Sequence, residues 1–374
     1  MINRVTQADV AKRAGVHVTT VSMALRNHRS LPVATRQRIQ ALAEQMGYKP
    51  DPVLGALMVY RKNQRHTETT GTLGYITNWD AEWSWKKLPA HAEFFSGATA
   101  KAAELGFHLE HFWLGEAGLS HRRMSDILLS RGITGLILAS WHPNLNEDLR
   151  FDWPKFSAVK IDYLPQSPKL HNVSNDQRSV IQLAIRQIKA AGYRRIGSAM
   201  PRWWDQYVGR AWSAGFLAEQ NDCPEDERIP LLFFEDDEFL PSEPGKFIET
   251  TTQSKLAKWM QQYRPEVILG YGPFIRPQLA SLGISIPGDV AFVDCHREDD
   301  DLGTAGVHEN CLRVGELAVE ILAGQLQRNQ FGLPQFQTTS LVEGTWVEGA
   351  SLPPCEPSRR VTAKNQSQSE SNAV

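Results

Sequence analysis

The sequence lacks the features that mark several large classes of protein. No apolar run approaches the roughly 18–20 residues needed to cross a bilayer, and the N-terminal stretch is polar where a signal peptide is apolar. The four cysteines are far apart and form no CxxC pair, so neither a zinc site nor a disulfide framework is expected. There is no Gly-x-Ser-x-Gly elbow, Walker loop or His/Cys/Asp metal spacing. These absences predict a cytoplasmic protein, not an enzyme, that holds no metal and no cofactor.

Charge is distributed unevenly along the chain, although the net charge of the 374 residues is only −2. Residues 1–65 carry eleven Lys or Arg against three Asp or Glu, a net +8, whereas the remainder carries 29 against 39, a net −10. A basic head on an acidic body indicates that only the head meets a polyanion. The length predicts two to three domains.

The N-terminal residues have the pattern of short helices joined by a tight turn. Thr6 is suited to cap a first helix, with Asp9 completing a capping box, and Gly15 can adopt the positive φ that a turn requires. Apolar spacing predicts a second helix from Val18 to about Arg26, and a third from about Ala34 to Met46. This pattern is typical of a helix-turn-helix, whose second helix lies in a DNA major groove.

The run from Val5 to Ser22, with Thr35-Arg36 and Gly47-Tyr48 further on, resembles the headpiece of the lactose-repressor (LacI) type transcription regulators. The resemblance implies that residues 1–50 form the DNA-binding headpiece. It also implies that the residues reading the operator are His17, Val18, Thr19 and Met23. Those that hold phosphates or brace the headpiece would be Thr6, Thr20, Ser22, Arg26, Thr35 and Tyr48. The family commonly has arginine at Met23, and methionine can cover a thymine methyl but cannot grip guanine with two hydrogen bonds.

Residues 51–61 predict a short hinge helix, because Asp51 suits the N-cap and Pro52 the first helical position. So short a helix is not stable alone in water. The resemblance implies that it pairs with the hinge helix of a second copy in the minor groove, where Leu57 would wedge between base steps. The alternative is a helix packed on the body of the protein. Residues 62–70 are polar and predict a linker.

Residues 71–350 alternate strand-like and helical patterns, which predicts an α/β fold of doubly wound parallel sheets. A first half is expected to close with Val159–Ile161 and a second half to begin near Asn172. This stretch also resembles the family's core, which implies two lobes similar to a periplasmic sugar-binding protein, used for ligand binding and dimerisation. Residues 351–374 are rich in Ser, Pro and Asn and predict a disordered tail.

Ligands of doubly wound sheets bind beyond the carboxyl ends of the strands. Tryptophan beside acidic, amide or arginine side chains suits a sugar, since the ring stacks on the sugar while polar groups take its hydroxyls. For any single tryptophan the alternative is a place in the core. Arg210 is expected to substitute for an arginine that the family has where this chain has Trp212. The predicted ligand contacts are Asn78, Trp79, Asp80, Trp141, Asp176, Trp203, Trp204, Arg210, Tyr271 and His296.

The sequence therefore predicts a DNA-binding transcription regulator, expected to be a repressor, whose operator affinity is set by a small ligand, a sugar, held between two lobes. Its expected partners are a palindromic double-stranded operator, the effector and a second copy of the chain, with no membrane. A cytosolic sugar-binding sensor without a repressor role is the alternative. It would explain the body of the chain but not the basic headpiece.

Overall fold

The computed structural model describes residues 5–25, 27, 28, 30–48, 71–142, 148–234, 250–298, 301 and 303–355. Several predictions fall outside these residues: Arg26, the hinge helix with Leu57, the linker at 62–70 and most of the tail. They stay predictions. Among the described residues no helix is both long and apolar enough to cross a membrane.

The headpiece is a bundle of three helices: α1 (Gln7–Ala14), α2 (Val18–Leu25) and α3 (Val33–Gln45). The capping box is confirmed, because Asp9 N donates to Thr6 Oγ1 at 3.3 Å and Thr6 N donates to Asp9 Oδ2 at 2.8 Å. Gly15 has φ +68° and ends α1, as the turn required. The helices enclose a small apolar core of Val10, Ala11, Ala14, Val21, Ala24, Ile39 and Ala43. The predicted helix-turn-helix is confirmed.

The first lobe is built on a parallel sheet with the order β11-β5-β4-β3-β1-β2. Its strands are β1 (Gly71–Asn78), β2 (Phe107–Trp113), β3 (Gly135–Trp141), β4 (Ser157–Ile161), β5 (His171–Asn175) and β11 (Thr339–Val342). Its helices are α5 (Pro89–Glu104), α6 (His121–Ser130) and α12 (Cys311–Gln327), with short 3₁₀ turns at η1 (Ser84–Lys87) and η3 (Trp153–Lys155). Successive residues of β3 face opposite sides of the sheet. Ile137 packs with apolar residues of α5 and α12, and Leu138 packs with apolar residues of α6.

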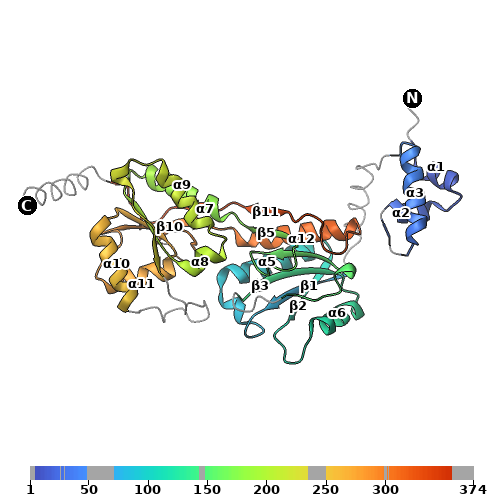
Figure 1. Cartoon of the computed structure of the whole chain (residues 1–374), viewed down its shortest axis with the longest axis horizontal. Coiled ribbons are helices and arrows are strands. Elements are labelled where there is room, and N and C mark those ends of the chain that lie inside the picture. The colour runs from blue at the N-terminus through green and yellow to red at the C-terminus, as the bar shows by residue number, and fades with distance from the viewer. Residues whose placement is uncertain are drawn as a thin grey trace, which may run out of the picture.

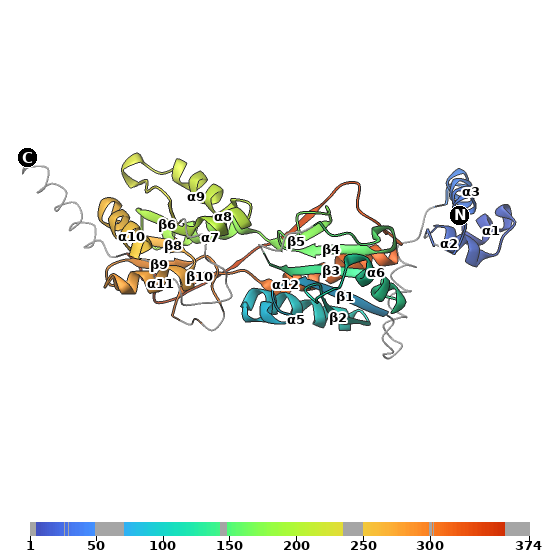
Figure 2. The ribbon, with the colours of Figure 1, turned by 60° about the horizontal axis from the view of Figure 1, so that its bottom comes forward.

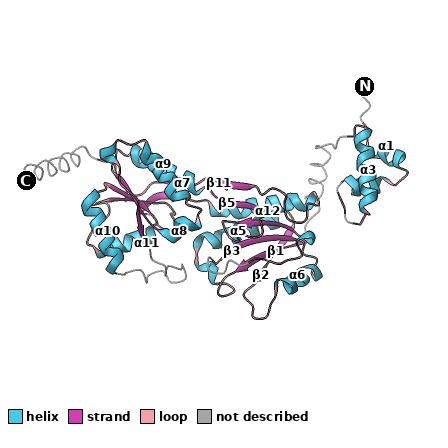
Figure 3. Ribbon diagram, in the orientation of Figure 1, coloured by secondary structure: helices cyan, strands magenta, loops and turns pink. Residues whose placement is uncertain are grey.

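The second lobe has the sheet order β12-β10-β9-β8-β6-β7, parallel except for the antiparallel pair of β12 with β10. Its strands are β6 (Ile196–Pro201), β7 (Leu232–Phe234), β8 (Val267–Gly270), β9 (Ala291–Asp294), β10 (Ala305–His308) and β12 (Thr345–Val347). Its helices are α7 (Gln177–Ala190), α8 (Arg202–Tyr207), α9 (Ala211–Asn221), α10 (Thr250–Tyr263) and α11 (Gly272–Ser281), with a 3₁₀ turn at η4 (Glu225–Glu227). The two sheets lie side by side, each between helices (Figures 1 and 3). The predicted doubly wound α/β core is confirmed.

The division of the chain between the lobes differs from the prediction. The first half does not close with β4, because β5 continues the first sheet through the pairing of Val159 with His171. The chain crosses after β5 into α7, returns after β10 into α12, and crosses again between β11 and β12. Figure 2 shows α12 beside α5 in the first lobe, although the two helices are far apart in the sequence. The expected second half near Asn172 was wrong because a strand's local pattern does not tell which sheet it joins.

Candidate functional site

A cavity lies between the lobes, at the carboxyl ends of strands from both sheets. Trp79 follows β1 and Trp141 ends β3, while Tyr271 follows β8. The volume open to the centres of water-sized spheres is about 70 Å³, room for roughly five waters at about 10–15 Å³ each. Six of the predicted ligand contacts line this cavity: Trp79, Trp141, Trp203, Trp204, Tyr271 and His296.

The other four predicted contacts lie outside the lining of the cavity. Asp80 accepts from Ser84 Oγ at 2.6 Å and holds a local turn. Asp176 caps α7 by accepting from Ser179 N at 3.0 Å. Arg210 is exposed, with φ +62°, at the start of α9, and Asn78 is buried at the end of β1. Asp80 and Asp176 accept from nearby backbone N–H groups of Ala81 and Ser179, which is why these two carboxylates do not reach the cavity.

The arginine substitution predicted at Arg210 is not seen in the lining. Trp212 is fully buried, and its Nε1 donates to Gln177 Oε1 at 2.5 Å. Gln177 itself lines the cavity. An indole and an amide therefore occupy the space behind the cavity wall, and the indole holds the amide in place.

Several lining residues were missed by sequence reasoning. Asp162 follows β4, Asn175 ends β5 and Glu309 follows β10, so the strand-end rule could have found all three. His91 and Phe94 come from the first turns of α5, where the sequence carries no signal for them. Asn175 and Glu309 were missed because β5 and β10 were not predicted as strands, whereas β4 was predicted and Asp162 at its end was not considered.

Glu309 forms a buried ion pair with His296 in the cavity wall. His296 Nδ1 lies 2.9 Å from Glu309 Oε2, and the Glu309 side chain is 4% exposed. Burial alone would lower the pKa of His296, but the Glu309 carboxylate raises it to about 9. His296 is therefore protonated at neutral pH, and the pair is neutral as a unit.

Asp162 connects the two lobes across the cavity. Tyr207 of α8 donates its hydroxyl to Asp162 Oδ2 at 2.8 Å, and Ser174 Oγ donates to Oδ1 at 3.3 Å. Burial raises the pKa of Asp162 to about 6, against the opposing effect of these hydrogen bonds. The contact gives the present arrangement of the lobes a direct link beside the ligand space.

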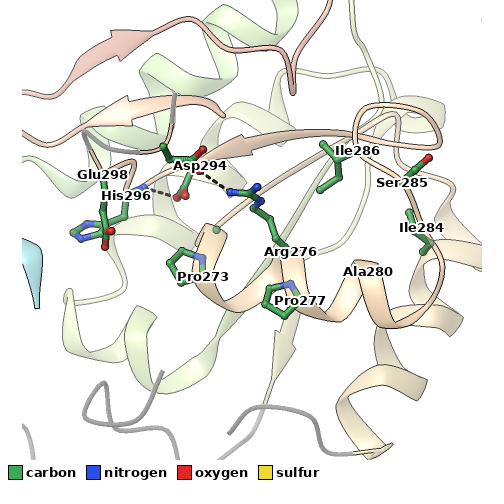
Figure 4. A pocket seen from close by; sticks show the side chains of 12 residues that line it. Pro273, Arg276, Pro277, Ala280, Ile284, Ser285, Ile286, Asp294, His296 and Glu298 are labelled. Atoms are coloured by element: carbon green, nitrogen blue, oxygen red, sulfur yellow. Dashed lines mark hydrogen bonds and ion pairs between the residues drawn. The ribbon is translucent and has the colours of Figure 1, made fainter. Parts of the chain in front are cut away.

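A second, more open hollow of about 700 Å³ lies beside the cavity in the second lobe and shares His296 and Glu298 with it. Figure 4 shows Arg276 of α11 within it, and Arg276 Nη1 donates to Asp301 Oδ2 at 2.6 Å. Asp294 accepts from His296 N at 2.9 Å, and burial raises its pKa to about 6. Within the described part of the chain no group of His, Cys, Asp and Glu suits a metal ion.

The headpiece presents polar and apolar side chains at the start of α2. His17, Val18 and Thr19 are exposed, whereas Thr20, Ser22 and Met23 are half-buried. Thr19 N donates to His17 Nδ1 at 3.4 Å, and Thr19 Oγ1 lies 2.9 Å from the same nitrogen.

The other predicted headpiece contacts have roles within the fold. Thr6 caps α1, and Tyr48 accepts from Gln7 Nε2 at 3.1 Å. Thr35 is half-buried on α3. These contacts stabilise the module, whatever else the side chains bind.

Comparison with known proteins bears on both parts of the chain. Residues 6–51 match the model of a family described as bacterial regulatory proteins, lacI family. The headpiece is therefore similar to the helix-turn-helix domain of this family. The matched segment is the described headpiece with the start of the predicted hinge.

Relatives of the family match further along the chain. The HTH-type transcriptional regulator MalR of Streptomyces coelicolor is 26% identical over 201 residues, which cover 52% of this chain and 53% of MalR. The HTH-type transcriptional repressor PurR of Aliivibrio salmonicida is 23% identical over 340 residues, or 86% of this chain and 92% of PurR. With MalR and two other Streptomyces regulators, the chain spans only about half to three fifths of their length.

A solved structure shows the same fold over nearly the whole chain. The complex of the transcriptional regulator CelR with cellobiose superposes with a TM-score of 0.52 at 17% identity, covering 93% of this chain and 100% of CelR. The chain therefore shares with that structure the fold of a helical headpiece followed by a two-lobed α/β core.

Proposed function

We propose that this chain is a sequence-specific transcriptional repressor whose operator affinity is set by a sugar bound between the lobes. Residues 1–50 would read DNA, 51–61 would form the hinge, and 71–350 would bind the effector and a second copy. The observation that carries the proposal is one chain that joins an exposed α2 face to a closed aromatic cavity. The action of MalR and PurR, as their names give it, supports the regulatory half.

For DNA recognition, the proposal assigns the operator contacts to the exposed start of α2. The exposed His17 ring can hydrogen-bond to a base edge, and Val18, which is 39% exposed, can contact a thymine methyl. Met23 accepts from Ser30 Oγ at 3.6 Å and contributes an apolar surface at that position. Each base contact of this kind contributes about 1–3 kcal/mol of discrimination.

For control by ligand, the proposal uses the link between the lobes. A ligand that contacts both walls has different affinity for different lobe angles, so it shifts the balance between them. The Asp162–Tyr207 hydrogen bond lies in the wall of the same cavity, and a bound ligand would strengthen or replace it. A change in lobe angle would alter how two hinge segments are presented to DNA.

The experiment selects binding sites for the full chain from random double-stranded DNA, then footprints the best site with and without maltose, cellobiose, glucose and ribose. We expect a palindromic footprint whose affinity changes with at least one sugar. His17→Ala should lower specific affinity by about tenfold or more, whereas Gln45→Ala, at the exposed end of α3, should not.

Two results would contradict the proposal in different ways. If the chain protects no specific DNA sequence at low salt, with or without sugars, the proposal that it is a transcription regulator is wrong. Sugar binding in that situation would instead support a sensor without a repressor role. If the chain protects a specific site but no sugar changes its affinity, the DNA-binding function is supported and the proposed control by a ligand is wrong.

A further inference from the structure

The cavity contains buried polar atoms for which the described residues supply no hydrogen-bond partner. Within the described part of the chain, Nε1 of Trp141 and Nε1 of Trp204 have no acceptor, and Glu309 Oε1 has no donor. Trp141 is 2% exposed and Glu309 is 4% exposed. Buried donors and acceptors without a partner are destabilising. All three residues line the same space, so a ligand there would satisfy them together.

The two indole donors come from opposite lobes. Trp141 ends β3 of the first sheet, and Trp204 lies on α8 of the second lobe. Tyr271 stacks on the Trp204 ring at 6.1 Å and Tyr207 at 5.7 Å. With its faces packed in this way, Trp204 meets a ligand through its N–H edge. A ligand that fits must therefore place a hydrogen-bond acceptor toward each lobe.

The charges around this space are acidic. Asp162, Glu298 and Glu309 line it, and no lysine or arginine is among the lining residues that the structure describes. His296 is the charged base of the lining, and Glu309 neutralises it at 2.9 Å. His91 adds no positive charge, because burial and the nearby His296 lower its pKa to about 4.

We propose that the effector carries no negative charge, being a neutral sugar or its amino counterpart, and that the cavity rejects sugar phosphates and sugar acids. The inference rests on the proposed function, in which a sugar is the effector. A phosphate or carboxylate needs paired cationic donors, which arginine supplies best. Here the ligand's anion would instead face carboxylates in a closed space, and like charges in contact oppose binding strongly. Hydroxyl groups, by contrast, accept from the indoles and donate to Glu309.

The first test measures thermal shift and tryptophan fluorescence of the full chain with sets of related probes. Glucose, galactose and mannose are each compared with their 6-phosphate, uronic acid and 2-amino forms, and maltose and cellobiose are included as neutral disaccharides. We expect binding by a neutral sugar, at least tenfold weaker binding of its phosphate and acid forms, and equal or tighter binding of the amino form.

Different failures have different meanings in this test. A phosphate or uronic acid that binds as tightly as its neutral parent overturns the inference and leaves a sugar-controlled regulator intact. If no probe of any charge binds, the sugar effector of the proposed function is contradicted, and the inference is overturned with it.

Variants test the two chemical claims separately. Trp204→Phe keeps an aromatic ring but removes the N–H, and should weaken the neutral sugar about tenfold. Trp83→Phe, at an indole that is 43% exposed and outside the cavity lining, is the control and should change affinity by less than twofold. Glu298→Gln should reduce severalfold the ratio of the affinity for a neutral sugar to the affinity for its phosphate or acid form. Unchanged affinity in Trp204→Phe, or an unchanged ratio in Glu298→Gln, would contradict the corresponding claim.

Discussion

Helix α12 packs against α5 in the first lobe (Figure 2). Gly315 of α12 lies against the α5 backbone at Phe94 and Ala98, and its replacement by alanine tests this packing. A Cβ at Gly315 would overlap the carbonyl oxygen of Phe94 and lie 2.8 Å from Ala98 N. Real Cβ atoms do not come within 3.0 Å of other heavy atoms. The obstructing atoms are backbone, so no side chain can rotate away and the two helices must move apart.

Separation of the helices has a calculable cost. Overpacking of a well-packed core costs about 1–3 kcal/mol, and the upper end applies where backbone obstructs. About 3 kcal/mol lowers the melting temperature of a lobe of this size by roughly 6–12 °C, at about 2–4 °C per kcal/mol. Because Phe94 lines the cavity, Gly315→Ala should also weaken ligand binding.

The assay is calorimetric melting of the full chain, followed by titration with the tightest sugar probe. Gly324→Ala is the matched control on the same helix, because its Cβ would meet only the end of the Arg328 side chain at 3.1 Å. It should be neutral or stabilise by up to about 1 kcal/mol, since alanine favours helix over glycine. Equal melting of Gly315→Ala and wild type, or equal losses in both variants, would refute the close-crossing argument.

Three further predictions concern single contacts. Thr6→Ala removes the α1 cap and should cost the headpiece about 0.5–2 kcal/mol, measured as faster amide exchange in α1 with the core unchanged as the reference. Trp212→Phe leaves Gln177 Oε1 buried without its donor and should cost about 1–3 kcal/mol in urea unfolding; an unaltered midpoint would contradict this. The raised pKa of His296, about 9 against 6.5 unfolded, stabilises fully below pH 6.5 and is lost as pH rises toward 9. Relative to His296→Gln, wild type should therefore lose about 3 kcal/mol over that range, and parallel stability profiles would refute the pairing.

The headpiece was predictable because its signals are local. The cap at Thr6, its partner Asp9 and the turn at Gly15 lie within ten residues of one another, and each depends on its own backbone conformation. No distant contact is needed to read them. The predicted second helix begins with α2 at Val18 and ends one residue after it. The predicted third helix begins and ends one residue later than α3.

The lobe boundaries were not predictable in the same way because strand pairing is long-range. β5 joins the first sheet through β4, and β11 joins it through β5 from more than 150 residues away. Nothing in the pattern of His171–Asn175 distinguishes a last strand of one sheet from a first strand of the next. Only the pairing of β5 with β4 shows which sheet this strand joins.

The strand ends identified the aromatic lining and His296 but not Asp162, Asn175 and Glu309. Aromatic rings at strand ends have no local backbone partner, so they pack into the space between lobes. Asp176 instead caps α7, and its neighbour Asn175 turns inward and donates to the Glu309 carbonyl at 2.5 Å. A polar side chain at a strand end therefore reaches a ligand only when no helix start claims it.

The tryptophan at position 212 agrees with the acidic lining of the cavity. The family resemblance predicts an arginine at that position, a donor suited to charged or paired acceptors. Here the indole of Trp212 donates to Gln177, which itself lines the cavity, and the replacement brings no positive charge. A ligand without negative charge needs no guanidinium, so the loss of the arginine and the carboxylates of Asp162 and Glu298 favour the same class of effector. Trp212→Arg would place a cation behind the wall and should raise the affinity for uronic acids relative to neutral sugars; a fall in that ratio would contradict the electrostatic argument.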